Sequence, residues 1–143
     1  MKSPAELTEL FRARGLKVTP QRQAIFRVLH GETAHPTAEW VYDAVSESMP
    51  TISLRTVYQT LNDLAAMGEV HALDLGTGSA RFDPNIDDHH HLVCDQCGRV
   101  VDVYADASAV KVAGPQRHGF TISHTDVVFR GTCPTCKRKE GNA

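Results

Sequence analysis

The chain has 143 residues, of which 41% are hydrophobic and 22% are charged, a composition typical of a globular protein rather than of a disordered or fibrous one. This length suits one ordinary domain or two small ones. No stretch approaches the roughly 18 consecutive apolar residues of a membrane helix, and the first residues lack the apolar core of a signal peptide. We therefore expect a cytoplasmic protein without membrane contact.

The formal net charge of −2 excludes a chain that is basic throughout. Basic residues nevertheless gather in residues 10–31, a stretch without any acidic residue, namely Arg12, Arg14, Lys17, Arg22 and Arg27. A local basic surface can bind nucleic acid even when the whole chain is slightly acidic. The charge distribution therefore favours DNA as a partner more than the net charge does.

Four segments in the first seventy residues show the spacing of apolar residues that is typical of amphipathic helices. Their limits are marked by N-capping residues, glycines and prolines. The first segment ends at Gly15, the second follows Thr19, the third runs from Thr37 to before Pro50, and the fourth lies between Ser53 and Gly68.

A hairpin signal follows the fourth predicted helix. Two short apolar runs in EVHALDLGTGSARFD are separated by Gly76, Thr77 and Gly78. Three to four helices followed by a β-hairpin form a winged helix-turn-helix, in which the last helix before the wing enters the DNA major groove. We therefore expect an α+β protein whose residues 1–84 form an N-terminal winged helix-turn-helix DNA-binding domain.

The sequence after Pro84 changes to strand-like runs, HHLVC, RVVDVY and FTISHTDVVFRGTC. A short helix is expected between Asp106 and Val112. We place a domain boundary near residues 84–88 and assign residues 85–143 to a small C-terminal α/β domain. A domain of about 55 residues usually needs a disulfide or a structural metal to be stable.

The cysteines form two Cys-x-x-Cys pairs, Cys94 with Cys97 and Cys133 with Cys136. In a cytosolic protein this pattern is more typical of a metal site than of disulfides. Four thiolates complete the tetrahedral ligand set of one structural Zn²⁺ per chain. The alternative is a pair of redox-active motifs of the thioredoxin kind, but the sequence lacks the βαβ setting of that motif.

Three histidines precede the first cysteine pair in DDHHHLVC. On a strand, His89 and His91 point to one face and His90 to the other, and Asp102 could reach the first two from the next strand. His35 in HPTA and Asp83 at the end of the wing are candidates by position. A lone histidine such as His35 is more often a packed or surface residue than a ligand. Because four thiolates already saturate a zinc ion, these residues would form a second site.

Together these motifs resemble the ferric uptake regulator family of bacterial metal-dependent repressors. The matching segments follow the family's order over nearly the whole chain: GLKVTPQRQAIFRVL, HPTAEWVY, SLRTVYQTLNDLAAMGEV, SARFD, HHHLVCDQCGRVVD and GTCPTC. The resemblance implies a homodimer on palindromic double-stranded operator DNA, with the second domain as the dimerisation domain. It points to the peroxide-sensing branch, because iron-sensing relatives tend to have glutamate where Asp83 stands.

In that branch, three histidines and two aspartates hold one regulatory Fe²⁺ or Mn²⁺ per subunit. The resemblance assigns these roles to His35, Asp83, His89, His91 and Asp102. Nitrogen and oxygen ligands without a thiolate suit iron or manganese better than a site chosen for zinc. The resemblance also implies that the metal links the two domains, and that peroxide oxidises a histidine ligand, here His35 or His89, when Fe²⁺ is bound.

We expect the DNA contacts to come from two segments. Tyr58 and Gln59 in the recognition helix are candidates for base contacts, and Arg55 for a contact to base or phosphate. Lys17 and Arg22 are candidates for phosphate or minor-groove contacts. The alternative for Tyr58 is partial packing into the core.

One departure from the family pattern and three alternatives accompany this interpretation. Many relatives have a further metal site, but its places here are Ala109 and Thr125, with His124 one position away, so we expect that site to be absent or degraded. A nutrient sensor for iron, manganese, zinc or nickel in the same family is the first alternative. A metalloenzyme is the second, and the absence of His-Glu-x-x-His and of a general base makes us expect no enzyme. A zinc ribbon without DNA binding is the third, and it leaves the four predicted helices without a role.

Overall fold

The computed structural model describes residues 1–141, which divide into two compact units, one up to Ile86 and one from Asp87 onward. The last two residues of the predicted second domain, 142–143, lie outside the described residues. None of the helices among the described residues combines the length and the apolar character that crossing a membrane requires.

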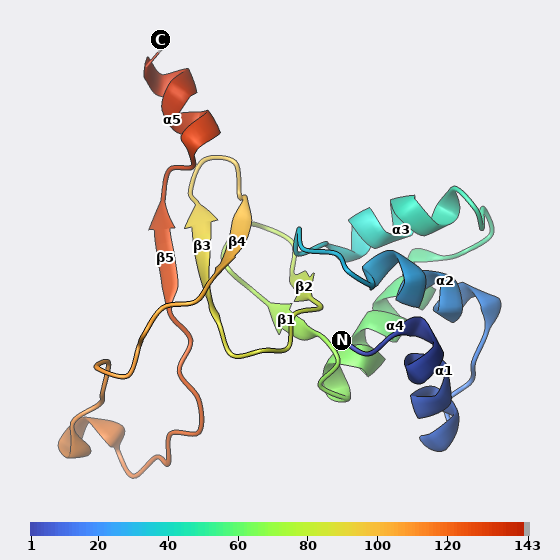
Figure 1. Ribbon diagram of the computed structural model, residues 1–143, viewed down its shortest axis with the longest axis horizontal. Coiled ribbons are helices and arrows are strands. Elements are labelled where there is room, and N and C mark those ends of the chain that lie inside the picture. The colour runs from blue at the N-terminus through green and yellow to red at the C-terminus, as the bar shows by residue number, and fades with distance from the viewer. Residues whose placement is uncertain (142–143) are drawn as a thin grey trace. The chain divides into compact units, whose positions relative to one another are not determined.

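Four helices make up most of the first unit (Figure 1): α1 (Pro4–Ala13), α2 (Pro20–Leu29), α3 (Ala38–Ser46) and α4 (Leu54–Ala66). Each follows an N-cap whose hydroxyl accepts a hydrogen bond from a first-turn amide, in order Ser3, Thr19, Thr37 and Ser53. These caps satisfy amides that have no partner inside the helix. The four helices predicted from the sequence are confirmed.

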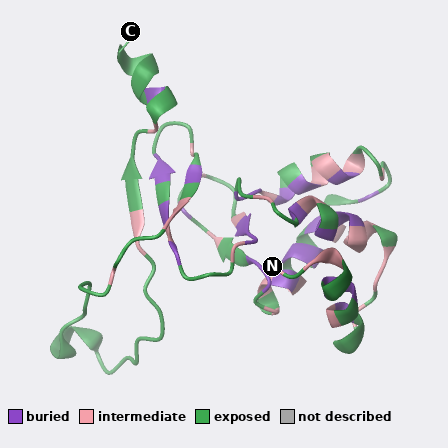
Figure 2. Cartoon of the chain, in the orientation of Figure 1, coloured by how far each residue is buried: buried purple, intermediate pink, exposed green. Residues whose placement is uncertain are grey.

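The apolar faces of these helices form one core, which Figure 2 shows as the buried stripes of α1 to α4. Its fully buried members include Leu7, Phe11, Ile25, Phe26, Leu29, Val41, Val57, Leu61 and Leu64. The rings of Phe11 and Phe26 meet edge to face at 4.9 Å. Burying each such side chain contributes roughly 1.5–3 kcal/mol, so this core determines how the helices pack.

A two-stranded antiparallel hairpin follows α4, made of β1 (His71–Leu73) and β2 (Arg81–Asp83). Gly76 and Gly78 in its turn have φ values of 73° and 107°, which residues with a Cβ rarely adopt. Phe82 fixes the hairpin to the helices, because its side chain is buried in their core. Helices followed by this hairpin form a winged helix, as the sequence predicts for this part of the chain.

An ion pair between an exposed lysine and a buried glutamate connects the start of the chain to the turn after α4. Glu69 is 3% exposed and accepts hydrogen bonds from the backbone amide of Lys2, at 3.1 Å, and from its ammonium group. Burial favours a raised pKa for this carboxyl, but the hydrogen bonds and charge of Lys2 outweigh it and hold the pKa below the ordinary value. The ionised form of Glu69 therefore stabilises the folded state.

We expect Glu69→Gln to lower the free energy of unfolding at pH 7 by about 1–3 kcal/mol, because the amide cannot replace the charge that faces Lys2. A carboxyl whose pKa is lowered by folding loses its stabilising effect as the pH falls below its unfolded value, ordinarily 4.5 for glutamate. The difference in the free energy of unfolding between parent and variant should therefore become smaller in acid. Urea unfolding at several pH values measures it. The exposed Glu47→Gln serves as control, and an equal loss there would contradict the assignment.

The second unit contains a three-stranded sheet in the order β4-β3-β5 (Figure 1). Its strands are β3 (His90–Cys94), β4 (Val100–Val103) and β5 (Val128–Gly131). β3 pairs antiparallel with β4 and parallel with β5. Helix α5 (Pro134–Gly141) follows β5. Together with the winged helix, this unit confirms the predicted α+β class.

The segment between β4 and β5 differs from the prediction. The helix expected between Asp106 and Val112 is wrong: the chain makes a turn there, in which the Asp106 carboxylate accepts the Ser108 amide at 2.9 Å. A short 3-10 helix, η1 (Gly114–Arg117), follows instead. The strand expected from Phe120 onward begins only at Val128, because pairing with β3 starts there.

Candidate metal centres

The four cysteines gather at one end of the sheet in the second unit, with their sulfur atoms within 4.8 Å of one another. The parallel register of the sheet explains this, because it places Cys94 at the end of β3 opposite Gly131. Both Cys-x-x-Cys segments therefore begin at the same end of the sheet. The Sγ atoms of Cys97 and Cys133 are 3.7 Å apart, and none of the four thiols is in a disulfide. We call this group the tetrathiol site.

Backbone amides favour thiolates at two of these positions. The amides of Cys97 and Cys133 lower the pKa of Cys94 to about 6, and the Cys133 amide lies 3.3 Å from its sulfur. The Cys136 amide likewise lowers the pKa of Cys133. Contact with the Cys133 sulfur and burial raise the pKa of Cys136 to about 12, because crowded thiols do not all ionise without a cation. A divalent cation removes this repulsion, so the donor set fits Zn²⁺.

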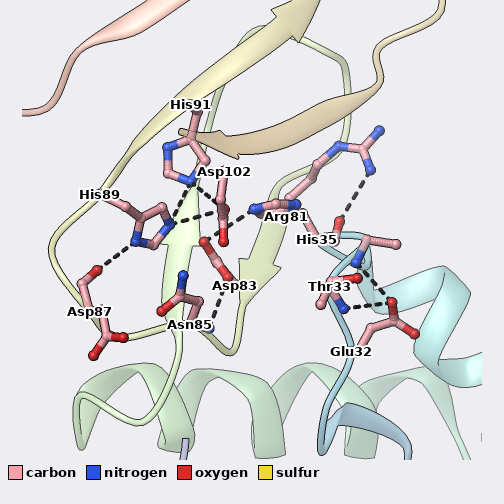
Figure 3. A network of polar contacts seen from close by, with 11 residues as sticks. Glu32, Thr33, His35, Arg81, Asp83, Asn85, Asp87, His89, His91 and Asp102 are labelled. Carbon is pink, nitrogen blue, oxygen red and sulfur yellow. Dashed lines mark hydrogen bonds and ion pairs between the residues drawn. The ribbon is translucent and has the colours of Figure 1, made fainter. Parts of the chain in front are cut away.

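A second donor group in the same unit consists of His89, His91 and Asp102, which we call the His–Asp trio. His91 lies directly opposite Asp102 in the register of β3 and β4, and His89 is on the same face as His91. Their side chains point toward one another (Figure 3). The two Nε2 atoms are 3.1 Å apart, and Asp102 Oδ1 is 3.1 Å from that of His89 and 3.5 Å from that of His91.

The geometry of the trio suits a small divalent ion. His89 Nδ1 lies 2.5 Å from the carbonyl oxygen of Asp87 (Figure 3), so we assign the ring proton to Nδ1. This leaves the lone pair of Nε2 facing the other two donors, the usual arrangement of a histidine ligand. Donor atoms about 3 Å apart match ligand bonds of about 2.1 Å. Both histidines are buried, which protects such an ion from water.

The middle histidine has a different role. His90 points to the other face of β3, as strand alternation predicts. Its Nδ1 accepts a hydrogen bond from the Val127 amide at 3.1 Å. His90 therefore holds the segment that leads into β5 and is not part of the trio.

The first unit contains a buried histidine–aspartate pair, the His35–Asp83 pair. His35 Nε2 is 3.2 Å from Asp83 Oδ2, and the two side chains are 1% and 3% exposed. Asp83 ends β2, and its Oδ1 accepts the Asn85 amide at 2.9 Å. These two residues are 48 positions apart in the sequence and meet because of contacts between the segment before α3 and the wing.

Those contacts fix the backbone of His35. Its carbonyl oxygen accepts a hydrogen bond from the Arg81 guanidinium at 3.1 Å, and the Phe82 amide donates to the carbonyl of Pro36 at 2.9 Å. His35 has a left-handed backbone with φ 54°, a conformation that costs about 1–3 kcal/mol in a residue with a side chain and that clusters at ligand sites. The sequence carries no signal for Arg81 as a supporting residue.

The structure gives no sign of the further metal site of some relatives. Within residues 1–141, no third group of three or more histidine, cysteine or carboxylate side chains gathers within ligand distance. His124 is exposed and contacts Asp126, with 2.8 Å between Nε2 and Oδ1. Ala109 and Thr125, at the other expected places, offer no histidine or carboxylate ligand.

The predicted DNA contacts lie on the surface of the first unit, with one exception. Arg55, Tyr58 and Gln59 are exposed on α4, and Lys17 is exposed before α2. Tyr58 is 37% exposed, whereas its neighbour Val57 is fully buried. The side chain is therefore accessible at the surface, and Tyr58 is not among the side chains packed against the helical core.

The exception is Arg22, whose side chain is only 12% exposed. Its Nη1 donates to the carbonyl oxygen of Lys17 at 2.7 Å, and its Nη2 lies 3.5 Å from the Asp63 carboxylate on α4. The guanidinium also covers the ring of Phe11 at 5.4 Å. These contacts join the segment of residues 16–19, which contains Lys17, to α4.

The first unit is a winged helix, a fold that binds DNA. The chain also has a tetrathiol site and separate histidine–aspartate groups, which are sets of metal ligands. Together these features define a metal-binding DNA-binding protein. The chain belongs to the Ferric uptake regulator family, whose sequence profile matches residues 13–130. This match confirms the family resemblance that the sequence motifs indicate.

Individual relatives support the same placement. Peroxide-responsive repressor PerR of Staphylococcus epidermidis is 39% identical over 132 residues, which cover 92% of this chain and 87% of that protein. A structure of the ferric uptake regulator from Pseudomonas aeruginosa with manganese is 30% identical and has a TM-score of 0.65. The match covers 88% of this chain and 96% of that one. PerR from Streptococcus pyogenes, in a structure described as a basis for peroxide sensing and gene regulation, is 27% identical, with a TM-score of 0.55 and coverage of 95% and 94%.

Proposed function

We propose that the protein is a metal-dependent transcriptional repressor that binds a palindromic DNA operator as a homodimer and responds to peroxide. The observation that carries this proposal is the separation of ligand types into a tetrathiol site and thiol-free histidine–aspartate groups. Thiolates suit one structural Zn²⁺ per subunit, whereas imidazole and carboxylate suit Fe²⁺ or Mn²⁺. The similarity to peroxide-responsive PerR proteins supports peroxide as the signal over metal supply.

The His35–Asp83 pair and the His–Asp trio would hold the same regulatory ion. Each group alone offers too few donors for a six-coordinate metal, and together they offer three nitrogens and two carboxylates. An ion that takes ligands from both units restricts their relative orientation. Metal binding and DNA binding are then coupled reciprocally, because each stabilises the same arrangement.

The peroxide response would use the ligands themselves. With Fe²⁺ held there, the metal would supply the first electron that breaks the O–O bond of hydrogen peroxide, and a ligand ring would supply the rest. We propose that one peroxide oxygen is added to the ring of His35 or His89 while the other leaves as water. The His89 ring is oriented by the Asp87 carbonyl and the His35 ring by the Asp83 carboxylate. An oxidised ring is a poorer ligand, and DNA is released. Since the ligand is consumed, the protein acts as a regulator and not as an enzyme.

The DNA-binding surface would be formed by α4 and the segment of residues 16–19 before α2. We propose that Tyr58 and Gln59 contact bases in the major groove, that Arg55 contacts base or phosphate, and that Lys17 contacts phosphate or the minor groove. The contacts of Arg22 favour a role in positioning Lys17 against α4 over a phosphate contact of its own. Such a repressor works in the cytoplasm, where bacterial DNA lies.

The homodimer would form through the second unit. Its sheet exposes three large apolar side chains, Leu92 at 46%, Val101 at 38% and Phe129 at 43%. They line a surface hollow of about 300 Å³ beside the tetrathiol site. An apolar sheet face of this kind is typical of a surface that a second subunit covers. In a two-fold dimer, two recognition helices face the two halves of a palindrome.

The decisive experiment is exposure of the Fe²⁺-loaded protein to micromolar hydrogen peroxide, followed by peptide mass spectrometry and a DNA-binding measurement. We expect a peptide containing His35 or His89 to gain one oxygen while the protein loses its operator. The Mn²⁺-loaded protein is the matched control and should keep both its mass and its DNA. If the Fe²⁺ form keeps DNA with both histidines unmodified, and chelation alone releases it, the protein senses metal supply instead.

A further inference from the structure

A hydrogen bond on the surface of the first unit connects the recognition helix with the helix before it. The hydroxyl of Tyr58 on α4 donates to Oε1 of Glu39 on α3 at 2.7 Å. Both side chains are exposed, so the bond does not serve to satisfy buried polar groups. The residues are 19 positions apart, and neither the helical spacing nor a motif links them in the sequence.

The charge of Glu39 fixes the direction of this bond. Glu39 lies in the first turn of α3, where the helix dipole favours a carboxylate. The Tyr58 hydroxyl and the backbone amide of Glu39 lower the pKa of its carboxyl, and the same bond to Glu39 raises the pKa of Tyr58. At neutral pH a carboxylate only accepts and a phenol has one proton to give. The proton of Tyr58 is therefore directed to Glu39.

We propose that Glu39 is a specificity-determining residue, because it makes the Tyr58 oxygen an acceptor toward DNA and so directs it to a base that presents an amino group. In the major groove, adenine offers the N6 amino group and cytosine the N4 amino group, whereas guanine and thymine present acceptors at the corresponding positions. The inference rests on the proposed DNA binding through α4 and specifies what Tyr58 reads.

Glu39 also disfavours the wrong bases. Guanine O6 and thymine O4 would face the lone pairs of the phenol and the nearby negative charge, without a proton between them. Specificity often comes from such unfavourable contacts with a competitor. Asp43, one turn further along α3, is exposed and acidic, whereas the Tyr58 hydroxyl bonds to Glu39. Asp43 is therefore a matched control for charge.

The test is a selection from random palindromic duplexes by the Mn²⁺-loaded chain of 143 residues, followed by sequencing. We expect the parent to enrich adenine or cytosine at one position of each half-site. Glu39→Gln should reduce that preference roughly tenfold, because a glutamine amide can donate to the phenol and release its proton for guanine or thymine. Asp43→Asn removes the same charge and should leave the preference unchanged.

A base analogue provides the second measurement. Replacing the selected adenine by purine, or the selected cytosine by its 4-deamino analogue, should weaken parent binding roughly tenfold and leave Tyr58→Phe binding unaffected. An unchanged preference in Glu39→Gln, or enrichment of guanine or thymine by the parent, overturns the inference while DNA binding stands. A parent protein that selects no sequence at all overturns the proposed function as well.

Discussion

Replacing Cys94 or Cys133 with serine is expected to remove zinc from the second unit, to unfold it and to abolish the dimer. The sheet has three short strands, and its buried apolar side chains are few, Val93 and Val100 beside the cysteines. Such a small core does not offset the entropy of ordering the unit without a metal. Zinc content, sedimentation velocity and thermal unfolding measure the three effects.

The first unit should survive these substitutions, because its helical core lies within residues 1–86. The helical circular dichroism should therefore largely remain while zinc is lost. Thr135→Ser, in the turn between Cys133 and Cys136, is the matched control and should change nothing. If the Cys94→Ser protein stays dimeric and keeps one zinc ion per subunit, the thiols are not the ligands of that zinc.

Asp102→Ala and His91→Ala should each abolish metal-activated DNA binding while zinc content and dimer are kept. Each removes one donor from the trio, where the atoms are only 3.1–3.5 Å apart. The Mn²⁺ concentration needed for half-maximal DNA binding should rise by at least about 100-fold, beyond the 10–100-fold effect typical of supporting residues. Fluorescence anisotropy of labelled operator DNA gives this value. The exposed His124→Ala is the control, and normal activation of Asp102→Ala by Mn²⁺ would exclude the trio as the regulatory site.

Asp83→Glu separates the peroxide sensor from the supply sensor. A longer carboxylate can still bind a cation through one or both oxygens, so Mn²⁺-activated DNA binding should largely survive. Binding through both oxygens would occupy the position at which peroxide reaches the metal, so the Fe²⁺ form should lose most of its peroxide sensitivity. Equal peroxide sensitivity in parent and variant would show that Asp83 does not control this access.

Local signals in the sequence predict the first unit well. Hydroxyl N-caps such as Thr19, apolar stripes such as Leu61 and Leu64, and the glycines of the wing all act within a few residues. The spacing of the cysteines likewise predicts the tetrathiol site without knowledge of the fold. The alternation of His89, His90 and His91 predicts which of the three share a face.

Other features depend on residues far apart in the chain, and no local pattern marks them. The meeting of His35 with Asp83 requires the segment before α3 to pair with the wing. The orientation of His89 depends on a backbone carbonyl, which every residue type possesses. Helix α5, with the sequence PTCKRKEG, has no apolar stripe that could predict it, and Cys136 is its one buried residue. The helix expected after Asp106 does not form, because a turn closed by the Asp106 side chain competes with it.

The parallel pairing of β3 with β5 has a consequence for the connection between β4 and β5. Strands β4 and β5 are each bonded to β3 and not to each other. Residues 104–127 therefore start at one edge strand of the sheet and return at the opposite edge strand. A protease cut in this connection would leave two fragments that stay associated through the β3–β5 ladder and through a zinc ion bound by one cysteine pair from each fragment. Insertions and deletions in this connection can therefore accumulate during evolution without disturbing the strand ladder or the cysteine pairs.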